Sequence, residues 1–174
     1  MKEIISLRGI DIFQHNFQQV LIRSNGGENL SKMIKEETSL DVPNENLKIS
    51  ANKESLLAKN SFDQWSLIYL KEKSHKDLIK FVSSINLDQS MLASDYSYGQ
   101  VYFNISGEKR NFYLNKLTHF DLRPKKFLVS TMAQTLIAGI DCSIYNFNDN
   151  YIITCNKSFE GYFKERLLDA INLL

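Results

Sequence analysis

The chain has 174 residues, of which 43% are hydrophobic and 24% are charged, so it is long enough to bury a core as one domain or as two small packed lobes. Its 21 basic residues nearly balance its 20 acidic residues, and no block of Lys and Arg stands out. This balance argues against nucleic-acid binding, which usually needs a basic excess on one face.

The amino-terminal segment, residues 1–8, has an acid at Glu3 and no long apolar run, so we expect no signal peptide. No window of the sequence approaches the roughly 18 apolar residues of a membrane span, so we expect no membrane association. The chain also has only two cysteines. These features together predict a protein of the reducing cytoplasm.

The first forty residues predict one strand and one helix. Residues 20–23 form a short apolar run that ends at the turn signal Asn25-Gly26-Gly27. Asn29 is a candidate N-cap for a helix through about Glu37.

Two strands and a second helix are expected next. The strands are predicted at 47–57 and 64–70, and Ser74 is predicted to cap the helix. The segment 87–94 is predicted to connect two lobes. The apolar face expected for the helix consists of Leu78, Ile79, Val82 and Ile85.

The second half shows clearer patterns. Residues 101–105 alternate between apolar and polar side chains, which is typical of a half-buried strand. Ser106 is expected to cap a helix with Tyr113, Leu114 and Leu117 on its apolar stripe.

The carboxyl-terminal third predicts strands and one more helix. Residues 129–147 read as one long strand or two shorter ones, and residues 151–155 as another. Ser158 is the predicted N-cap of the last helix. Its expected apolar face consists of Phe159, Tyr162, Phe163, Leu167, Ala170 and Ile171.

This order of elements, β-α-β-β-α repeated twice, predicts an α+β fold of two interlocked ferredoxin-like lobes with helices on one face of each sheet. We expect the lobes to span 1–90 and 91–174 and to form one compact unit. No sequence repeat accompanies the repeated order.

Candidate catalytic and metal-binding residues are few. His15, His75 and His119 are far apart in sequence, with no thiol or acidic partner nearby that would suggest a metal site. No Gly-x-Ser-x-Gly elbow is present. If Asn148-Asp149 is a two-residue hairpin turn, Cys142 lies opposite Cys155, and we expect two reduced, packed thiols.

An ordered series of short motifs carries a family resemblance. In order and spacing, the series resembles the gamma subunit of heterotetrameric sarcosine oxidase, whose fold is that of the folate-binding domain of the glycine-cleavage T-protein. The resemblance covers roughly residues 50 to 174. The motifs are Asp95-Tyr96-Ser97, Ser106-Gly107, Asp121-Leu122-Arg123-Pro124, Gln134-Thr135-Leu136, and Ser158-Phe159 with Tyr162.

The chain departs from the resembled families at two places. Asp63 and Trp65 match the gamma family, but Ser61-Phe62 stands where that family often has Gly-Pro; we expect Trp65 in a core or lobe interface. T-proteins carry paired Gly and paired Asp residues near 138–142. Ala138 and Cys142 replace one member of each pair here, which argues against aminomethyltransferase activity in this chain.

Asp95 and Asp141 are the only candidates for folate binding. The resemblance implies that Asp95, with Ser97, could position a folate amine, and that Asp141 could accept a proton. The alternative, which we favour, is that Asp95 satisfies the turn leading to Gly99 and that Asp141 is an acid at a strand end or turn.

The resemblance implies a place in an enzyme complex. The resembled enzyme demethylates sarcosine to glycine, passes electrons through flavins to oxygen and transfers the one-carbon unit to tetrahydrofolate. Its alpha and beta subunits carry FAD, FMN, NAD and the folate site, and its delta subunit carries zinc. We therefore expect a cytoplasmic, non-catalytic structural gamma subunit of a heterotetramer in sarcosine catabolism and one-carbon metabolism, inactive alone and bound to alpha, beta and delta subunits.

Three alternatives remain at this point. The chain could be a stand-alone folate-binding or aminomethyltransferase-like protein. It could belong to the related folate-dependent proteins of iron–sulfur maintenance, although neither cysteine lies in their Lys-Gly-Cys-Tyr-x-Gly-Gln-Glu signature. It could also be a binding module for another ligand.

Overall fold

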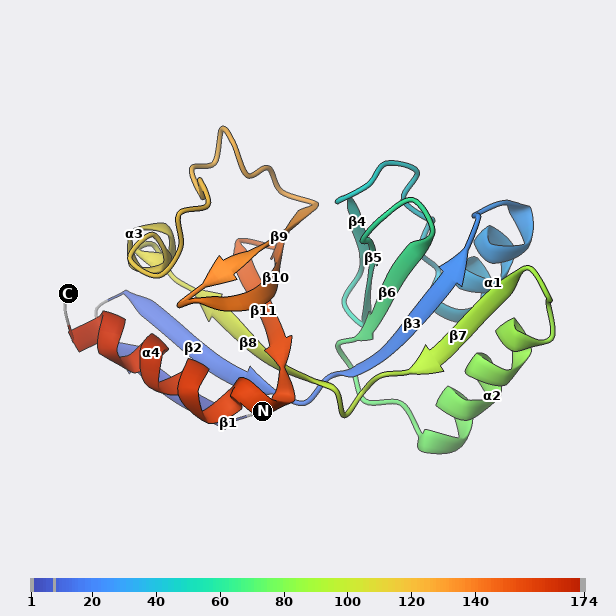
Figure 1. Cartoon of the computed structure of the whole chain (residues 1–174), viewed down its shortest axis with the longest axis horizontal. Helices are drawn as coiled ribbons and strands as arrows, with labels where there is room; N and C mark the ends of the chain where they lie inside the picture. Colours follow the sequence, from blue (N-terminus) through green and yellow to red (C-terminus); the bar gives the residue numbers. More distant parts are fainter. Residues whose placement is uncertain (1, 8, 173–174) are drawn as a thin grey trace. The chain divides into compact units, whose positions relative to one another are not determined.

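The structure is a computed structural model that describes residues 2–7 and 9–172. Its strands form two antiparallel sheets (Figure 1), and the α+β class predicted from the sequence is confirmed. The contacts divide the chain into two units, unit 1 with the described residues of Met1–Asn16 and Tyr98–Leu174, and unit 2 with Phe17–Ser97.

This division differs from the expected boundary between 90 and 91. Strand β2 (Ile10–His15) pairs with β8 (Gln100–Ser106), which places the amino-terminal strands in unit 1. The segment expected to be a connector contains strand β7 (Met91–Asp95), which pairs with β3 (Gln18–Ser24) in unit 2. Both pairings join segments far apart in sequence, and local patterns do not encode them.

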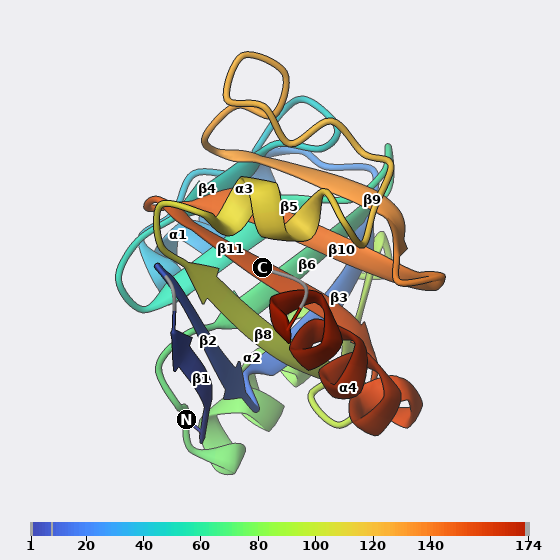
Figure 2. The ribbon, with the colours of Figure 1, turned by 90° about the vertical axis from the view of Figure 1, so that its left-hand side faces the viewer.

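Unit 1 contains a six-stranded sheet in the order β1-β2-β8-β11-β10-β9. Helices α3 and α4 lie over one face of this sheet (Figure 2), and the core between them includes Phe103 and Phe163, whose ring centroids are 5.1 Å apart. The remaining elements are β1 (Lys2–Leu7), α3 (Arg110–Leu114), β9 (Thr131–Ile137), β10 (Ile140–Phe147), β11 (Asn150–Asn156), the 3-10 turn η1 (Lys157–Phe159) and α4 (Glu160–Asn172).

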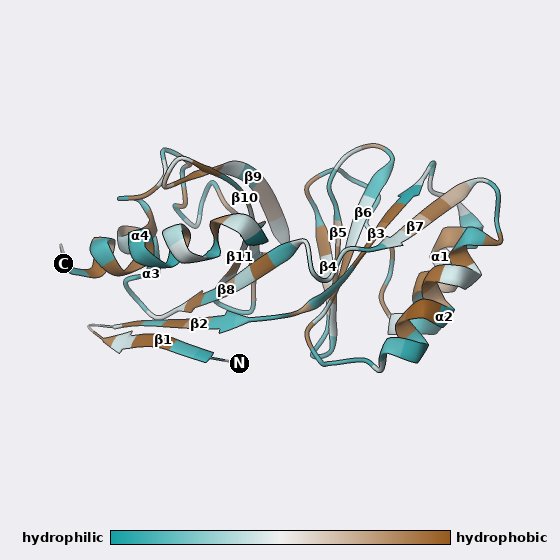
Figure 3. Ribbon diagram, turned by 60° about the horizontal axis from the view of Figure 1, so that its bottom comes forward, coloured by the Kyte–Doolittle hydropathy of each residue, from teal (hydrophilic) through white to brown (hydrophobic). Residues whose placement is uncertain are grey.

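Unit 2 contains a five-stranded sheet in the order β4-β5-β6-β3-β7. Two amphipathic helices, coloured in alternating hydrophobic and hydrophilic stripes in Figure 3, pack on one face of it. Trp65 is 2% exposed in this core, as expected, with Lys59 Nζ 5.2 Å from its ring centroid. The remaining elements are α1 (Glu28–Thr38), β4 (Ile49–Ala51), β5 (Ser55–Lys59), β6 (Gln64–Tyr69) and α2 (His75–Asn86).

The strand predicted at 101–105 and the hairpin turn predicted at Asn148-Asp149 are confirmed, whereas the single strand predicted at 47–57 is wrong, because β4 and β5 form a hairpin there. Val101, Phe103 and Ile105 point into the core from β8. Asn148 and Asp149 both have positive φ, at 49° and 58°, as a tight two-residue hairpin turn requires. The resulting register places Cys142 opposite Cys155, and both cysteines are buried and free.

Only one of the predicted helix caps is confirmed. Ser74 caps α2, because its Oγ accepts a hydrogen bond from the Asp77 N–H at 3.2 Å. Asn29 does not cap α1, which begins at Glu28 after Gly27; its side chain donates to Asp88 instead.

The two N-caps predicted in the second half of the chain, Ser106 and Ser158, are also wrong. The helix after Ser106 is only five residues long and begins after Lys109. Ser158 lies inside η1, and the preceding Asn156 accepts its N–H at 2.9 Å. In each case a polar residue near the helix start gave the expected signal, but the chain enters the helix at a different residue.

The predicted apolar helix faces are partly wrong. Phe81 replaces Ile79 in the buried face of α2, and Ile79 is 48% exposed. Phe159 and Tyr162 are 47% and 50% exposed, whereas the other predicted residues of the last helix are buried. The helices of the described residues include none that is long and apolar enough to cross a membrane.

Candidate functional site

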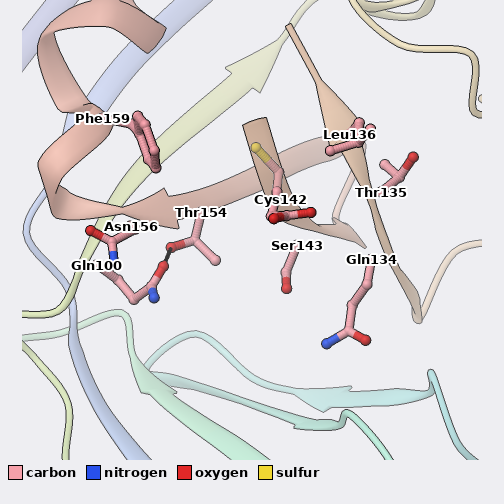
Figure 4. Close-up of a pocket in the computed structure, with 10 residues that line it drawn as sticks. Gln100, Gln134, Thr135, Leu136, Cys142, Ser143, Thr154, Asn156 and Phe159 are labelled. Carbon is pink, nitrogen blue, oxygen red and sulfur yellow. Dashed lines mark hydrogen bonds between the residues drawn. The ribbon is translucent and has the colours of Figure 1, made fainter. Parts of the chain in front are cut away.

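A pocket of unit 1 has a volume of about 750 Å³ and lies on the strands β8, β9, β10 and β11. Figure 4 shows its lining, with Phe159 at one side and Gln134 at the other. Most lining residues alternate with core residues along their strands, so they project from the sheet face opposite to α3 and α4. The lining consists of Gln100, Gln134, Thr135, Leu136, Asp141, Cys142, Ser143, Thr154, Asn156 and Phe159.

Much of the polar lining is engaged in local hydrogen bonds. Thr154 Oγ1 lies 3.0 Å from Gln100 Oε1 and 2.9 Å from the Val101 carbonyl oxygen (Figure 4). Asn156 Oδ1 accepts from the N–H and the hydroxyl of Ser158. These groups stabilise the sheet and the start of η1, so they are held in place before any ligand arrives.

Asp141 is the only charged residue of this lining. It is exposed and lies opposite Leu136 in the β9–β10 hairpin. Within the described part of the chain, no cation pairs with its carboxylate. The pocket therefore offers one unpaired acid among neutral amides and hydroxyls, an environment that suits a cationic or neutral polar group.

Asp95, the other acid singled out in the sequence, lies in unit 2. Its Oδ1 accepts from the Ser97 N–H at 3.0 Å and from the Ser97 hydroxyl at 2.5 Å. This is an Asx-type turn at the end of β7. The hydrogen bonds therefore give Asp95 a structural role in the chain's turn, while Asp141 is the candidate that lines a pocket.

The thiol that lines the pocket, Cys142, is a poor nucleophile. The contact with Cys155 and burial both raise the pKa of Cys142 well above its usual range, because they disfavour the thiolate. The described residues include no group of three or more His, Cys, Asp or Glu side chains that could hold a metal ion. The pocket therefore presents no activated nucleophile.

Unit 2 contains a charged cluster that the sequence did not reveal. The Tyr69 hydroxyl donates to Glu37 Oε1 at 2.8 Å, the Lys73 ammonium pairs with the same carboxylate, and burial raises the pKa of Tyr69. Lys73 Nζ also lies 5.0 Å from the centroid of the Tyr69 ring. The cluster ties the end of α1 to the segment after β6, and no spacing in the sequence would have indicated it.

Comparison with known proteins identifies the family. A model of the sarcosine oxidase gamma subunit family matches residues 34–172. The chain belongs to this family. Membership makes it a subunit of sarcosine oxidase and confirms the resemblance inferred from the motifs. The match also begins earlier than the expected start near residue 50.

Solved structures show the same fold. One is a heterotetrameric sarcosine oxidase from Corynebacterium sp. U-96 in complex with pyrrole 2-carboxylate, with a TM-score of 0.83 at 17% identity over 98% of this chain and 87% of that chain. Another is the glycine cleavage system aminomethyltransferase T from Bartonella henselae, with a TM-score of 0.66 at 11% identity over 92% of this chain. The match covers 45% of the aminomethyltransferase chain. A sequence search of curated proteins finds no match.

Proposed function

We propose that this chain is a non-catalytic structural gamma subunit of a heterotetrameric sarcosine oxidase that demethylates sarcosine to glycine with flavin and tetrahydrofolate. The observation that carries the proposal is the family match over residues 34–172. The lining of the pocket supports it, because the thiol there is buried and the hydroxyl of Thr154 is engaged in a local hydrogen bond. The subunit would contribute buried interface area to the complex, and obligate interfaces typically exceed about 2,000 Å².

The proposal assigns the chemistry to partner chains. FAD, FMN, NAD, tetrahydrofolate and zinc would be bound by alpha, beta and delta subunits in the cytoplasm. The polar residues of the pocket fit that assignment, since the only charged group of its lining is one carboxylate, Asp141. The isolated chain would then be inactive.

Co-purification tests this function. The tagged chain is expressed with its neighbouring open reading frames, and the visible spectrum of the retained material is recorded. We expect a stoichiometric complex with flavin absorption, and a colourless chain when it is expressed alone. A chain that stays free of flavoprotein partners would refute the proposal.

A second candidate is a stand-alone folate-binding or aminomethyltransferase-like protein. The pocket of about 750 Å³ with an unpaired Asp141 favours it, together with the aminomethyltransferase fold. Calorimetric titration of tetrahydrofolate into the chain alone tests it. Binding that Asp141→Asn weakens at least about tenfold, equivalent to roughly 1.4 kcal/mol, would move the function onto this chain.

A further inference from the structure

The two sheets have four edge strands among the described residues, and three of them are protected against pairing with another strand. Strand β4 is only three residues long. Strand β1 carries Lys2 and Glu3 and has an irregular register between Glu3 and Ile5. Short length, charge and bulges are all features that protect an exposed edge.

The edge of β7 is protected by a side chain. The Asn86 carboxamide donates to the Ala93 carbonyl at 3.0 Å and accepts from the Ala93 N–H at 2.6 Å. It therefore occupies the positions that the backbone of a neighbouring strand would occupy. This leaves β9 as the remaining edge.

Strand β9 is neither short, nor charged, nor interrupted by a bulge. Its seven residues, Thr-Met-Ala-Gln-Thr-Leu-Ile, include no charge and no proline. Its register with β10 is continuous from Thr131 to Ile137. A long, regular, uncharged edge is a template for another strand.

The geometry of the hairpin determines which backbone groups point outward. Ala138 and Gly139 form a two-residue turn with φ of 54° and 79°, so Ile137 and Ile140 exchange hydrogen bonds. Alternation then directs the N–H and C=O groups of Met132, Gln134 and Leu136 away from β10.

Hydrogen bonds near the turn agree with this assignment. The Thr118 hydroxyl donates to the Leu136 carbonyl at 2.7 Å, and the Ala138 N–H donates to the Leu117 carbonyl at 2.7 Å. The edge is thus covered at its carboxyl-terminal end. For Met132 and Gln134, no described residue bonds to the outward backbone groups.

The side chains beside this open edge indicate what kind of segment fits it. Gln134 and Leu136 line the pocket, and Leu136 is 55% exposed. Asp141 lies opposite Leu136 and has no cationic partner in the described part of the chain. A residue paired with Gln134 on a new strand would lie about 12 Å from Asp141, since neighbouring strands are about 4.8 Å apart and side chains on one face recur about every 7 Å along a strand. A Lys or Arg side chain and the Asp141 side chain together span most of that distance.

We propose that an extended segment of another sarcosine oxidase subunit adds to β9 as an outer strand, bonding to the backbone of Met132 and Gln134 and directing a Lys or Arg toward Asp141. This inference rests on the proposed function and names the surface that the complex uses. A second copy of this chain fits less well, because β9 itself contains no Lys or Arg to meet Asp141. The partner is therefore a different chain with a basic residue in an extended segment.

Hydrogen exchange of the chain alone and of the co-purified complex tests the proposal without any substitution. The outward amides of Met132 and Gln134 exchange with solvent in the free chain and become protected by about 100-fold in the complex. The Thr135 amide, which faces β10, is protected in both and serves as the internal control. Unchanged exchange at Gln134 in an intact complex overturns the inference while leaving the proposed function in place. Failure to form a complex overturns both.

Two substitutions at the same position separate backbone from side chain. Gln134→Pro removes only an outward N–H, so the pairing with β10 is retained, as expected for proline on a strand edge. We expect it to reduce the co-purified partner by about tenfold or more, the effect of losing roughly 1.4 kcal/mol. Gln134→Ala keeps the N–H and retains the partner. Equal loss in both variants contradicts backbone pairing, and thermal melting with Thr135 exchange verifies that each variant is folded.

Asp141→Lys tests the charge and the identity of the occupant. It places a like charge beside the expected Lys or Arg, so the partner is lost at low salt, whereas Asp141→Asn weakens retention less. If β9 becomes protected in the chain alone as concentration rises, a second copy occupies the edge and the proposal of a different subunit is wrong.

Discussion

The loop before α3 contains a close backbone contact that only glycine permits. Gly107 has φ of 102°, and a Cβ built on it would lie 2.2 Å from the Gly9 carbonyl oxygen and 2.9 Å from the Gly9 carbonyl carbon. The same oxygen accepts the Lys109 N–H at 3.3 Å. Gly107→Ala must therefore move backbone on one side of this contact.

The expected cost has two parts. The positive φ costs an L-residue about 1 kcal/mol, and displacement of packed backbone adds about 2 kcal/mol. We predict that Gly107→Ala lowers the free energy of unfolding by about 3 kcal/mol, which corresponds to about 6–12 °C in Tm for a chain of this size.

Gly139→Ala is the matched control in the same unit. Gly139 also has a positive φ, 79°, but a Cβ added there would meet no atom within 4 Å beyond the adjacent residues. Only the conformational part applies, so we expect a loss of about 1 kcal/mol, or about 2–4 °C. Differential scanning calorimetry measures both variants. Equal shifts in Tm would refute the close contact between Gly107 and Gly9.

Three further predictions concern other parts of the chain. Asn86→Ala removes both hydrogen bonds to the edge of β7. We expect the free energy of unfolding, measured in urea, to fall by about 1–2 kcal/mol, and higher-order species to appear in size-exclusion chromatography. A variant that stays monomeric at full stability would contradict this. Hydrogen bonds from Arg123 lower the pKa of the Asp121 carboxyl to about 2. The stabilisation by this ion pair is therefore complete above the pKa of Asp121 in the unfolded chain and is lost as the pH falls through about 2. Arg123→Ala raises that pKa toward 3.8 in an NMR titration, and an unchanged titration would show that the pair does not form. Cys142 resists alkylation by iodoacetamide at pH 8 in the folded chain and reacts after denaturation, because its thiolate is disfavoured; rapid labelling of the native chain would contradict this.

Local patterns predicted the elements whose signals lie within one segment. The alternation of β8, the cap at Ser74 and the register of Cys142 with Cys155 each depend on a few neighbouring residues, and each is confirmed. The burial of Trp65 followed from its size. These inferences needed no knowledge of distant pairing.

Features that depend on distant contacts were missed. Strands β1, β2 and β7 were not expected, because their stability comes from pairing with segments that are remote in sequence. A helix capped at Ser106 would place Gly107 in its first turn, whereas the structure brings Gly107 against the backbone of Gly9.

The candidate site was predicted only in part. Asp141 was singled out and does line a pocket, but the sequence could not show that its neighbours come from β8, β9 and β11. The open edge of β9 was equally hidden, because an edge is defined by which strand is absent beside it.

The central claim is that this chain functions inside a sarcosine oxidase complex. Native mass spectrometry of the tagged chain, co-expressed with its neighbouring open reading frames, tests it most directly. We predict one copy of the 20.2 kDa chain in a flavin-containing assembly with alpha, beta and delta subunits. A 20.2 kDa species that does not bind those subunits and does bind tetrahydrofolate would contradict this claim.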